Sequence, residues 1–183
     1  MKVFIEVNGL TELEHAGKWD EAKNMLYNLW DADKSNVSKL IRLISECWYV
    51  LAEWDCFIQN KALSFDAFRK ALAGAIQYGL AHFNRNADFL WISGYMISLF
   101  PELFCDGEEG ISLSKWEQKG VDMLLAANQI DASNPIAKVL YLGTQSASDE
   151  YAICKARLTP QLNNFFPGHT AIEEYFKEVL SEK

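Results

Sequence analysis

The sequence predicts an all-α fold, and three observations support this prediction. The chain of 183 residues contains only 4 prolines and 10 glycines, the residues that most often interrupt regular structure. Apolar residues recur three or four positions apart through nearly every segment, which is the spacing of one helix face. No alternating run rich in Val, Ile and Thr is longer than residues 2–7, so strands have little support. We expect about seven helices in antiparallel hairpins.

Three helices are predicted in the first half of the chain. An apolar stripe predicts the first over residues 18–31. The second begins after Ser35 and carries a wide apolar face, typical of a core helix, that ends near residues 59–60. The third follows Ser64, whose hydroxyl can accept a hydrogen bond from the first turn of a helix.

A fourth helix and a polar loop follow. Asn86 is expected to cap this helix. The helix should stop at Phe100, because Pro101 disfavours helical geometry in the residue before it. Residues 102–112 then form a loop rich in glycine and acidic residues.

Three further helices are predicted beyond this loop. Ser114 and Glu117 have the spacing of a capping box, which predicts a helix start. Asn134 is an N-cap candidate followed by Pro135, whose fixed φ suits the first helical position. A break near residues 143–148 and a helix over residues 149–158 should follow.

The C-terminal region is predicted to contain a linker and an amphipathic helix. The linker covers residues 159–169, which include two prolines. Thr170 and Glu173 form a second capping box in front of a short apolar stripe. No shift in composition divides the chain, so residues 1–183 are predicted to form a single all-α domain.

Composition and charge argue against several functional classes. Half of the residues are hydrophobic and the formal net charge is −8 at pH 7, a globular rather than a disordered composition. Nucleic-acid binding depends on clustered Lys and Arg, so we expect no nucleic acid ligand. No apolar run reaches the roughly 20 residues that span a bilayer, and no signal-peptide core begins the chain. We therefore expect no membrane association and a cytoplasmic location.

The cysteines are consistent with that location. They are widely spaced, form no Cys-x-x-Cys pair and lie in apolar surroundings, as buried thiols in a reducing compartment do. The four residues are Cys47, Cys56, Cys105 and Cys154.

Two segments resemble helical repeats of the tetratricopeptide (TPR) family. The first contains Gly17, Trp19, Glu21, Ala22, Leu26 and Leu29, and the second contains Gly120, Leu124, Ala127 and Pro135. The small residues Ala22, Ala67 and Gly120 are spaced more widely than the family period of about 34. The resemblance implies a protein-binding groove lined by the helices that start near Ser35, Asn86 and Asn134. A plain helical bundle would have the same periodicity.

No residue pattern points to catalysis or to a metal. Glu12 and His15 have the one-turn spacing of a di-metal site, but such a site needs a second copy of that pair, and the sequence has none. His82 is expected to be a helix-end residue that pairs with carbonyls or water rather than a ligand. Nucleophile elbows, phosphate loops and zinc-protease motifs are absent from the sequence. We expect a non-enzymatic protein without a cofactor or metal.

Acidic residues gather in two places that we take as a candidate partner-binding surface. The first group is N-terminal and contains Glu12, Glu14, Asp20, Glu21, Asp31 and Asp33. The second group lies in the polar loop and contains Asp106, Glu108 and Glu109. Trp30, at the end of its helix beside these carboxylates, is a candidate interface anchor.

These observations lead to three hypotheses on function. An acidic surface on a helical scaffold suits a basic protein partner. In size and acidity the chain is similar in physical type to bacterial immunity proteins, which implies inhibition of a basic toxin nuclease by covering its active-site cleft. The first alternative is a TPR-like adaptor or co-chaperone that binds a peptide in a concave groove. The second alternative is a helical enzyme or a regulator that binds a small molecule. The sequence leaves the oligomeric state open.

Overall fold

The computed structural model describes residues 2–54, 63–105, 113–145 and 149–181. It confirms the all-α prediction, since these residues form helices and connecting turns and contain no strand. The elements are α1 (Leu10–His15), α2 (Trp19–Asp31), α3 (Val37–Ala52), α4 (Phe65–His82), α5 (Ala87–Leu99), the 3-10 helix η1 (Pro101–Phe104), α6 (Leu113–Ile130), α7 (Pro135–Gly143), α8 (Asp149–Leu158), the 3-10 helix η2 (Thr159–Gln161), α9 (Leu162–Phe165) and α10 (Ala171–Ser181). None of the helices in this part of the chain is long and apolar enough to cross a bilayer.

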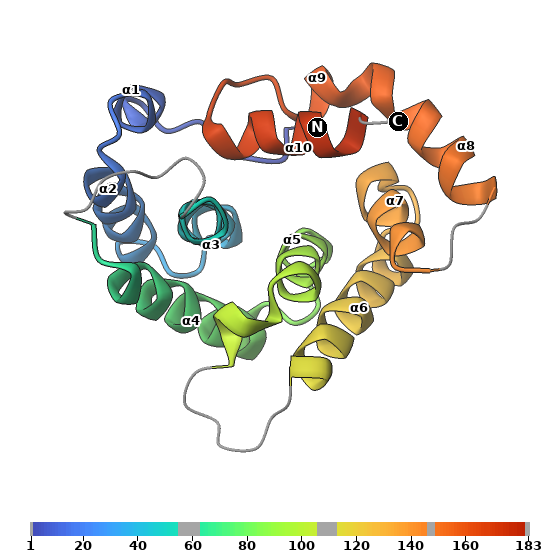
Figure 1. Cartoon of the computed structure of the whole chain (residues 1–183), viewed down its shortest axis with the longest axis horizontal. Helices are drawn as coiled ribbons and strands as arrows, with labels where there is room; N and C mark the ends of the chain where they lie inside the picture. Colours follow the sequence, from blue (N-terminus) through green and yellow to red (C-terminus); the bar gives the residue numbers. More distant parts are fainter. Residues whose placement is uncertain (1, 55–62, 106–112, 146–148, 182–183) are drawn as a thin grey trace.

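The helices curl around α3 and α5, which lie in the interior (Figure 1). α2 and α4 pack against α3, while α6 and α7 pack against α5. α10 returns to contact α3, and the N–H of Val3 donates to the carbonyl of Phe165 at 3.0 Å. The units of a solenoid contact only their sequence neighbours. These contacts between the N-terminal third of the chain and its last helices therefore give the chain a closed arrangement.

Side-chain caps explain where four helices begin. The predicted caps of α4, α5 and α7 are confirmed: Ser64 accepts a backbone hydrogen bond at 3.3 Å, Asn86 accepts one at 2.9 Å, and Asn134 accepts two at 3.0 and 3.1 Å. The helix that follows Ser35 is capped by Asn36, which accepts hydrogen bonds at 3.1 and 3.3 Å. Each cap pairs backbone N–H groups that the first helical turn leaves without a partner.

Two helix boundaries differ from the prediction. α3 ends at Ala52 rather than near residues 59–60, and those residues lie outside the described part of the chain. Trp54 continues the apolar stripe in sequence, but it lies in a turn, where its ring packs edge-on against Phe65 of α4 at 5.1 Å. α6 is already helical at Leu113, one residue before the predicted start at Ser114.

The predicted linker over residues 159–169 is also wrong, because η2 and α9 lie within it. Leu162 and Phe166 are buried there, and the ring of Phe166 stacks on Phe176 of α10 at 5.5 Å. Pro160 lies in the first turn of η2. A backbone N–H in the first turn has no partner within the helix, so the absence of this group in proline costs no hydrogen bond. Similarly, the predicted loop over residues 102–112 begins with the helical turn of η1.

The capping box of the last helix is present in part. The Glu173 carboxylate accepts hydrogen bonds from the Thr170 hydroxyl at 2.6 Å, from the Thr170 N–H at 3.4 Å and from the Gly168 N–H at 3.0 Å. Glu173 therefore ties the turn before α10 to its first helical residues.

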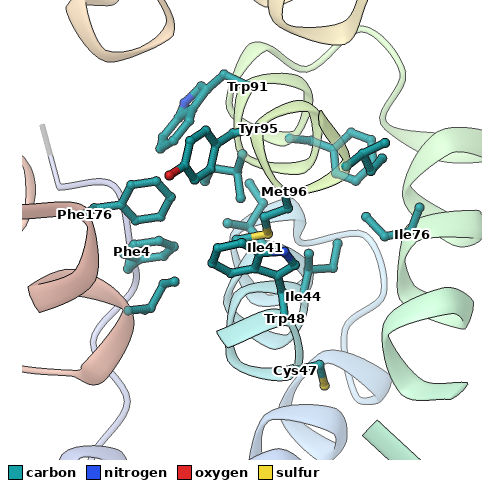
Figure 2. Packing of buried hydrophobic residues seen from close by; sticks show 14 of the residues in the cluster. Phe4, Ile41, Ile44, Cys47, Trp48, Ile76, Trp91, Tyr95, Met96 and Phe176 are labelled. Atoms are coloured by element: carbon teal, nitrogen blue, oxygen red, sulfur yellow. The ribbon is translucent and has the colours of Figure 1, made fainter. Parts of the chain in front are cut away.

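The buried apolar side chains form a cluster centred on α3 and α5. Figure 2 shows Trp48 of α3 near Met96 of α5, with Phe4 and Phe176 on one side and Ile76 on the other. Every residue of α5 from 89 to 97 is buried, as expected for a helix that is apolar on all sides.

A pair of glycines brings α5 and α6 into backbone contact. A Cβ at Gly94 would lie 2.8 Å from the carbonyl oxygen of Gly120, and a Cβ at Gly120 would lie 2.5 Å from the backbone nitrogen of Ser98. Neither distance leaves room for a methyl group. Gly120 is one of the residues that carried the resemblance to helical repeats. In this fold Gly120 allows the backbones of α5 and α6 to approach closely.

Candidate protein-binding surface

The N-terminal acidic residues lie on α1, on α2 and on the turn after α2. The chain reverses between α1 and α2 at Gly17, whose φ of 67° falls in the left-handed region that favours glycine. Asp20 and Glu21 lie in the first turn of α2, where the helix dipole stabilises negative charge. The reversal makes α1 and α2 neighbours in the fold.

Acidic side chains, amide side chains and one tyrosine lie on the solvent-facing side of α2. Its residues recur with helical spacing and opposite the buried Ala22, Leu26 and Trp30. We call this set the outer face of α2, and it consists of Asp20, Glu21, Asn24, Tyr27, Asn28 and Asp31. All of them are exposed except Asp20, which is half-buried. The ring of Tyr27 is 44% exposed, so an aromatic side chain lies among carboxylates on an open surface.

Lysines at the edges pair with the carboxylates of this face. Nζ of Lys18 lies 3.1 Å from Glu21, Nζ of Lys23 lies 2.7 Å from Asp20, and Nζ of Lys34 lies 2.9 Å from Asp31. Exposed ion pairs contribute only about 0–1 kcal/mol each. The carboxylates can therefore exchange a local lysine for the cation of a partner at little cost.

Lys23 differs from the other two lysines. Its side chain is 11% exposed, and its Nζ lies 4.5 Å from the ring centre of Phe68 on α4. Because this contact holds the lysine in place, Asp20 is less available to a partner than Glu21 and Asp31.

Asp33 has a local structural role. It accepts hydrogen bonds from the Ser35 hydroxyl at 2.8 Å and from Nζ of Lys39 at 3.1 Å. These bonds, that from Ser35 first, hold the pKa of the Asp33 carboxyl below its usual range. They order the turn between α2 and α3.

Glu12 lies on the exposed side of α1. Among the described residues it has no ion-pair partner. Its expected neighbour in a metal pair, His15, is likewise exposed at the end of the same helix. The described residues hold no group of three or more His, Cys, Asp or Glu arranged to bind a metal ion.

The structure contradicts the prediction that Glu14 belongs to the surface. Glu14 is 4% exposed and pairs with the buried Arg42 of α3 at 2.7 Å. Its other carboxylate oxygen accepts the backbone N–H of Ala171 at 2.6 Å. Glu14 faces inward because these partners, distant in sequence, satisfy its charge in the interior.

Trp30 is also buried and is not an exposed anchor. It is 6% exposed, and its ring packs edge-on against Tyr78 of α4 at 5.2 Å and against Tyr27 at 5.7 Å. Tyr27, which is exposed, was not among the residues predicted to bind a partner. Ala22, Leu26 and Trp30 are four residues apart, a spacing that places Trp30 on the buried stripe and leaves Tyr27 outside it.

The second predicted acidic group lies outside the described residues. It consists of Asp106, Glu108 and Glu109. The candidate surface in the described part of the chain is therefore the outer face of α2 together with Glu12.

Two of the three helices that the repeat resemblance assigns to a concave groove, α3 and α5, are contacted by α10. α3 and α5 form the interior of the molecule, and Tyr175 of α10 packs against Trp48 of α3 at 5.3 Å. The hydroxyl groups of Tyr175 and Tyr95 of α5 hydrogen-bond at 2.7 Å. α10 thus covers the side of α3 and α5 that a peptide would have to reach.

The described part of the chain includes three cavities, one of which lies between α5 and α7. One of about 400 Å³ lies between the N-terminal segment and the turn before α10, and includes Phe4, Thr11 and His169. One of about 170 Å³ lies between α4 and α6, beside Trp116. One of about 230 Å³ lies between α5, α7, α8 and α10 and is largely apolar. In the first of these cavities the hydroxyl of Thr170 donates to the Glu173 carboxylate at 2.6 Å.

Three of the cysteines lie in the described part of the chain, and none of the three forms a disulfide. Cys47 is buried, and burial raises the pKa of its thiol far above its usual value. Cys154 is half-buried, and the thiol of Cys105 donates to the carbonyl of Pro101 at 3.1 Å. Cys56 lies outside the described residues.

Comparison with known proteins gives no relative. No model of a protein family matches the chain, and no curated protein or solved structure matches it.

Proposed function

We propose that this protein is a non-enzymatic binding protein whose outer face of α2, with Glu12, contacts a basic protein. The supporting observation is that Tyr27 is exposed on the same side of α2 as Glu21 and Asp31, and that Asp31 lies one helical turn from it. Aromatic side chains supply much of the energy of protein interfaces, and complementary charge speeds association and sets orientation.

The most specific form of this proposal is an acidic immunity protein. Such a protein would cover the phosphate-binding cleft of a toxin nuclease with carboxylates in place of nucleic acid phosphates. The net charge of −8 supports this form, because a nuclease cleft is basic. The proposal includes a cytoplasmic location, which is supported by the absence of a disulfide among the described cysteines.

The experiment is affinity capture from the native host with wild-type protein and a Glu21→Lys/Asp31→Lys variant. A stoichiometric basic protein should bind the wild type and be lost from the variant. The matched control is Glu117→Lys/Asp122→Lys, which makes the same charge change at exposed positions of α6 and should retain the partner.

The outcomes test two proposals separately. The general proposal is that a basic protein binds the outer face of α2, and the specific proposal is that this partner is a toxin nuclease. If the captured protein is a nuclease, its activity should fall to background at one equivalent of wild-type protein. A basic partner without nuclease activity would contradict the immunity form alone. A partner that binds both double variants as well as the wild type would contradict the proposed surface.

A further inference from the structure

A buried group of charges lies away from the proposed surface. Glu14 of α1, Arg42 of α3 and Glu46 of α3 are each at most 4% exposed. Nη2 of Arg42 donates to Glu14 at 2.7 Å, and Nη1 of Arg42 lies 3.2 Å from Oε2 of Glu46. Glu14 also accepts the N–H of Ala171, the first residue of α10. This charged cluster (Glu14, Arg42 and Glu46) joins α1, α3 and α10.

The number of protons in the charged cluster sets its net charge. Arg42 stays protonated, so two ionised carboxylates would leave one uncompensated negative charge in the interior, where it is costly. One proton makes the charged cluster neutral. Oε1 of Glu46 accepts no hydrogen bond from the described part of the chain, which makes Glu46 the carboxyl whose ionisation is least compensated.

The surroundings of Glu46 favour its protonated form. Burial raises the pKa of Glu46 to about 8; Arg42 opposes this effect, and Glu14 adds to it by charge and by hydrogen bonding. Other titratable groups near this part of α3 include Cys47 and Tyr49 of α3, Glu53 just after it, Lys23 of α2, and Tyr175 and Glu178 of α10. The N-terminal segment contributes the uncharged ring of Phe4, 5.7 Å from the Arg42 guanidinium.

We propose that the protonation state of the charged cluster controls how firmly the first turn of α10 is held on α1. This contact is strongest when Glu46 carries a proton. Loss of that proton places a second negative charge beside Glu14. Water can relieve this charge at the contact between Glu14 and Ala171, because the cavity of about 400 Å³ is lined by Phe4 and by Thr170, the residue before Ala171.

The change is confined to the first turn, since aromatic contacts hold the later turns of α10 on the core. Phe176 packs on Phe4 at 6.1 Å and on Phe166 at 5.5 Å. Tyr175 hydrogen-bonds to Tyr95. Neither contact depends on the charge of Glu46, so the later turns of α10 provide an internal reference.

The direction of the pH effect follows from linkage. Opening of the turn lets water reach the charged cluster and so lowers the pKa of Glu46 from about 8 in the closed turn towards the ordinary glutamate value of 4.5. Between these values the closed form binds one more proton than the open form, so its stability falls as the pH rises. The protection of the first turn should fall up to about tenfold per pH unit across this window and level off above about pH 8.

The test is amide hydrogen exchange of Ala171 and Ile172, corrected for the intrinsic exchange rate, in wild type and Glu46→Gln at pH 5, 6, 7 and 8. Protection should fall with pH in the wild type and stay constant in the variant, while amides of α6 behave alike in both. Glu178→Gln, which removes an exposed carboxylate from α10, should match the wild type. Equal pH dependence in wild type and Glu46→Gln would overturn the proposal.

A carboxyl-carbon NMR titration of the wild type keeps the proposal testable if Glu46→Gln does not fold. Glu46 should titrate near pH 8, and the amide shift of Ala171 should change over the same range. Titration of Glu46 near pH 4.5 would overturn the proposal, as would titration near pH 8 without a change at Ala171.

Discussion

Trp30 and Tyr27 show that the position of a residue around a helix decides whether its side chain is buried or exposed. Both aromatics lie near the end of α2 among carboxylates, but Trp30 continues the four-residue spacing of Ala22 and Leu26 and is buried. That outcome could be predicted from spacing alone. The burial of Glu14 could not, because its partners Arg42 and Ala171 come from distant parts of the chain.

Substitution of Trp30 and of Tyr27 should change the free energy of unfolding by different amounts. Trp30→Ala removes a buried ring and should lower the free energy of unfolding by about 3–5 kcal/mol. Tyr27→Ala removes a largely exposed ring and should change it by less than about 1 kcal/mol. Urea denaturation followed by circular dichroism measures both values. Equal losses in the two variants would contradict the assignment of Trp30 to the core.

Removal of Arg42 should cost far more than removal of a surface cation. Arg42→Ala leaves Glu14 buried without its charged partner and should lower the free energy of unfolding by about 3–5 kcal/mol. Lys70→Ala, at an exposed position of α4, should change it by no more than about 0.5 kcal/mol. Similar values for both variants in urea denaturation would show that the charged cluster contributes little to stability.

At the scale of elements, the caps made several helix starts predictable. Ser64, Asn86 and Asn134 carry local signals that the structure confirms. η2 and α9 are too short to show a periodic stripe, and they form because Leu162 and Phe166 are buried in the core. Prolines in the same segment favoured a linker, so tertiary packing outweighed the local signal.

The approach of α5 to α6 can be tested with a single methyl group. Gly120→Ala places its Cβ against backbone atoms of α5, which cannot move aside as a side chain can. The helices must separate, and we expect a loss of about 1–3 kcal/mol in the free energy of unfolding.

Gly74→Ala on α4 is the matched control for Gly120→Ala. A Cβ there meets nothing within 4 Å, so this substitution should stabilise the protein by about 0.5–1 kcal/mol through helix propensity. Both changes are measurable as shifts of the urea midpoint. Stabilisation by Gly120→Ala would mean that α5 and α6 are not in backbone contact.

At the scale of the whole molecule, the closed arrangement depends on contacts that span the sequence. Val3 bonds to Phe165, Glu14 bonds to Ala171, and Trp48 packs on Tyr175. No local pattern encodes such pairs, so the sequence left both a solenoid and a closed bundle open. The closure covers α3 and α5 and leaves the outer face of α2 exposed to a partner.

The charged groups of the proposed surface lie in contact with solvent. Each carboxylate on the outer face of α2 has a nearby lysine, and Glu12 on α1 has no ion-pair partner among the described residues. Charged contacts with a partner should therefore be screened by salt, and the association rate should fall as ionic strength rises.

The most direct test of the proposed surface is calorimetric titration of the captured partner into wild-type protein, Tyr27→Ala and Glu21→Lys/Asp31→Lys. We predict 1:1 binding to the wild type, at least about tenfold weaker binding to each of the two variants, corresponding to 1.4 kcal/mol or more, and unchanged binding to the α6 control Glu117→Lys/Asp122→Lys. Equal dissociation constants for all four proteins would contradict the proposal that the outer face of α2 binds a basic protein.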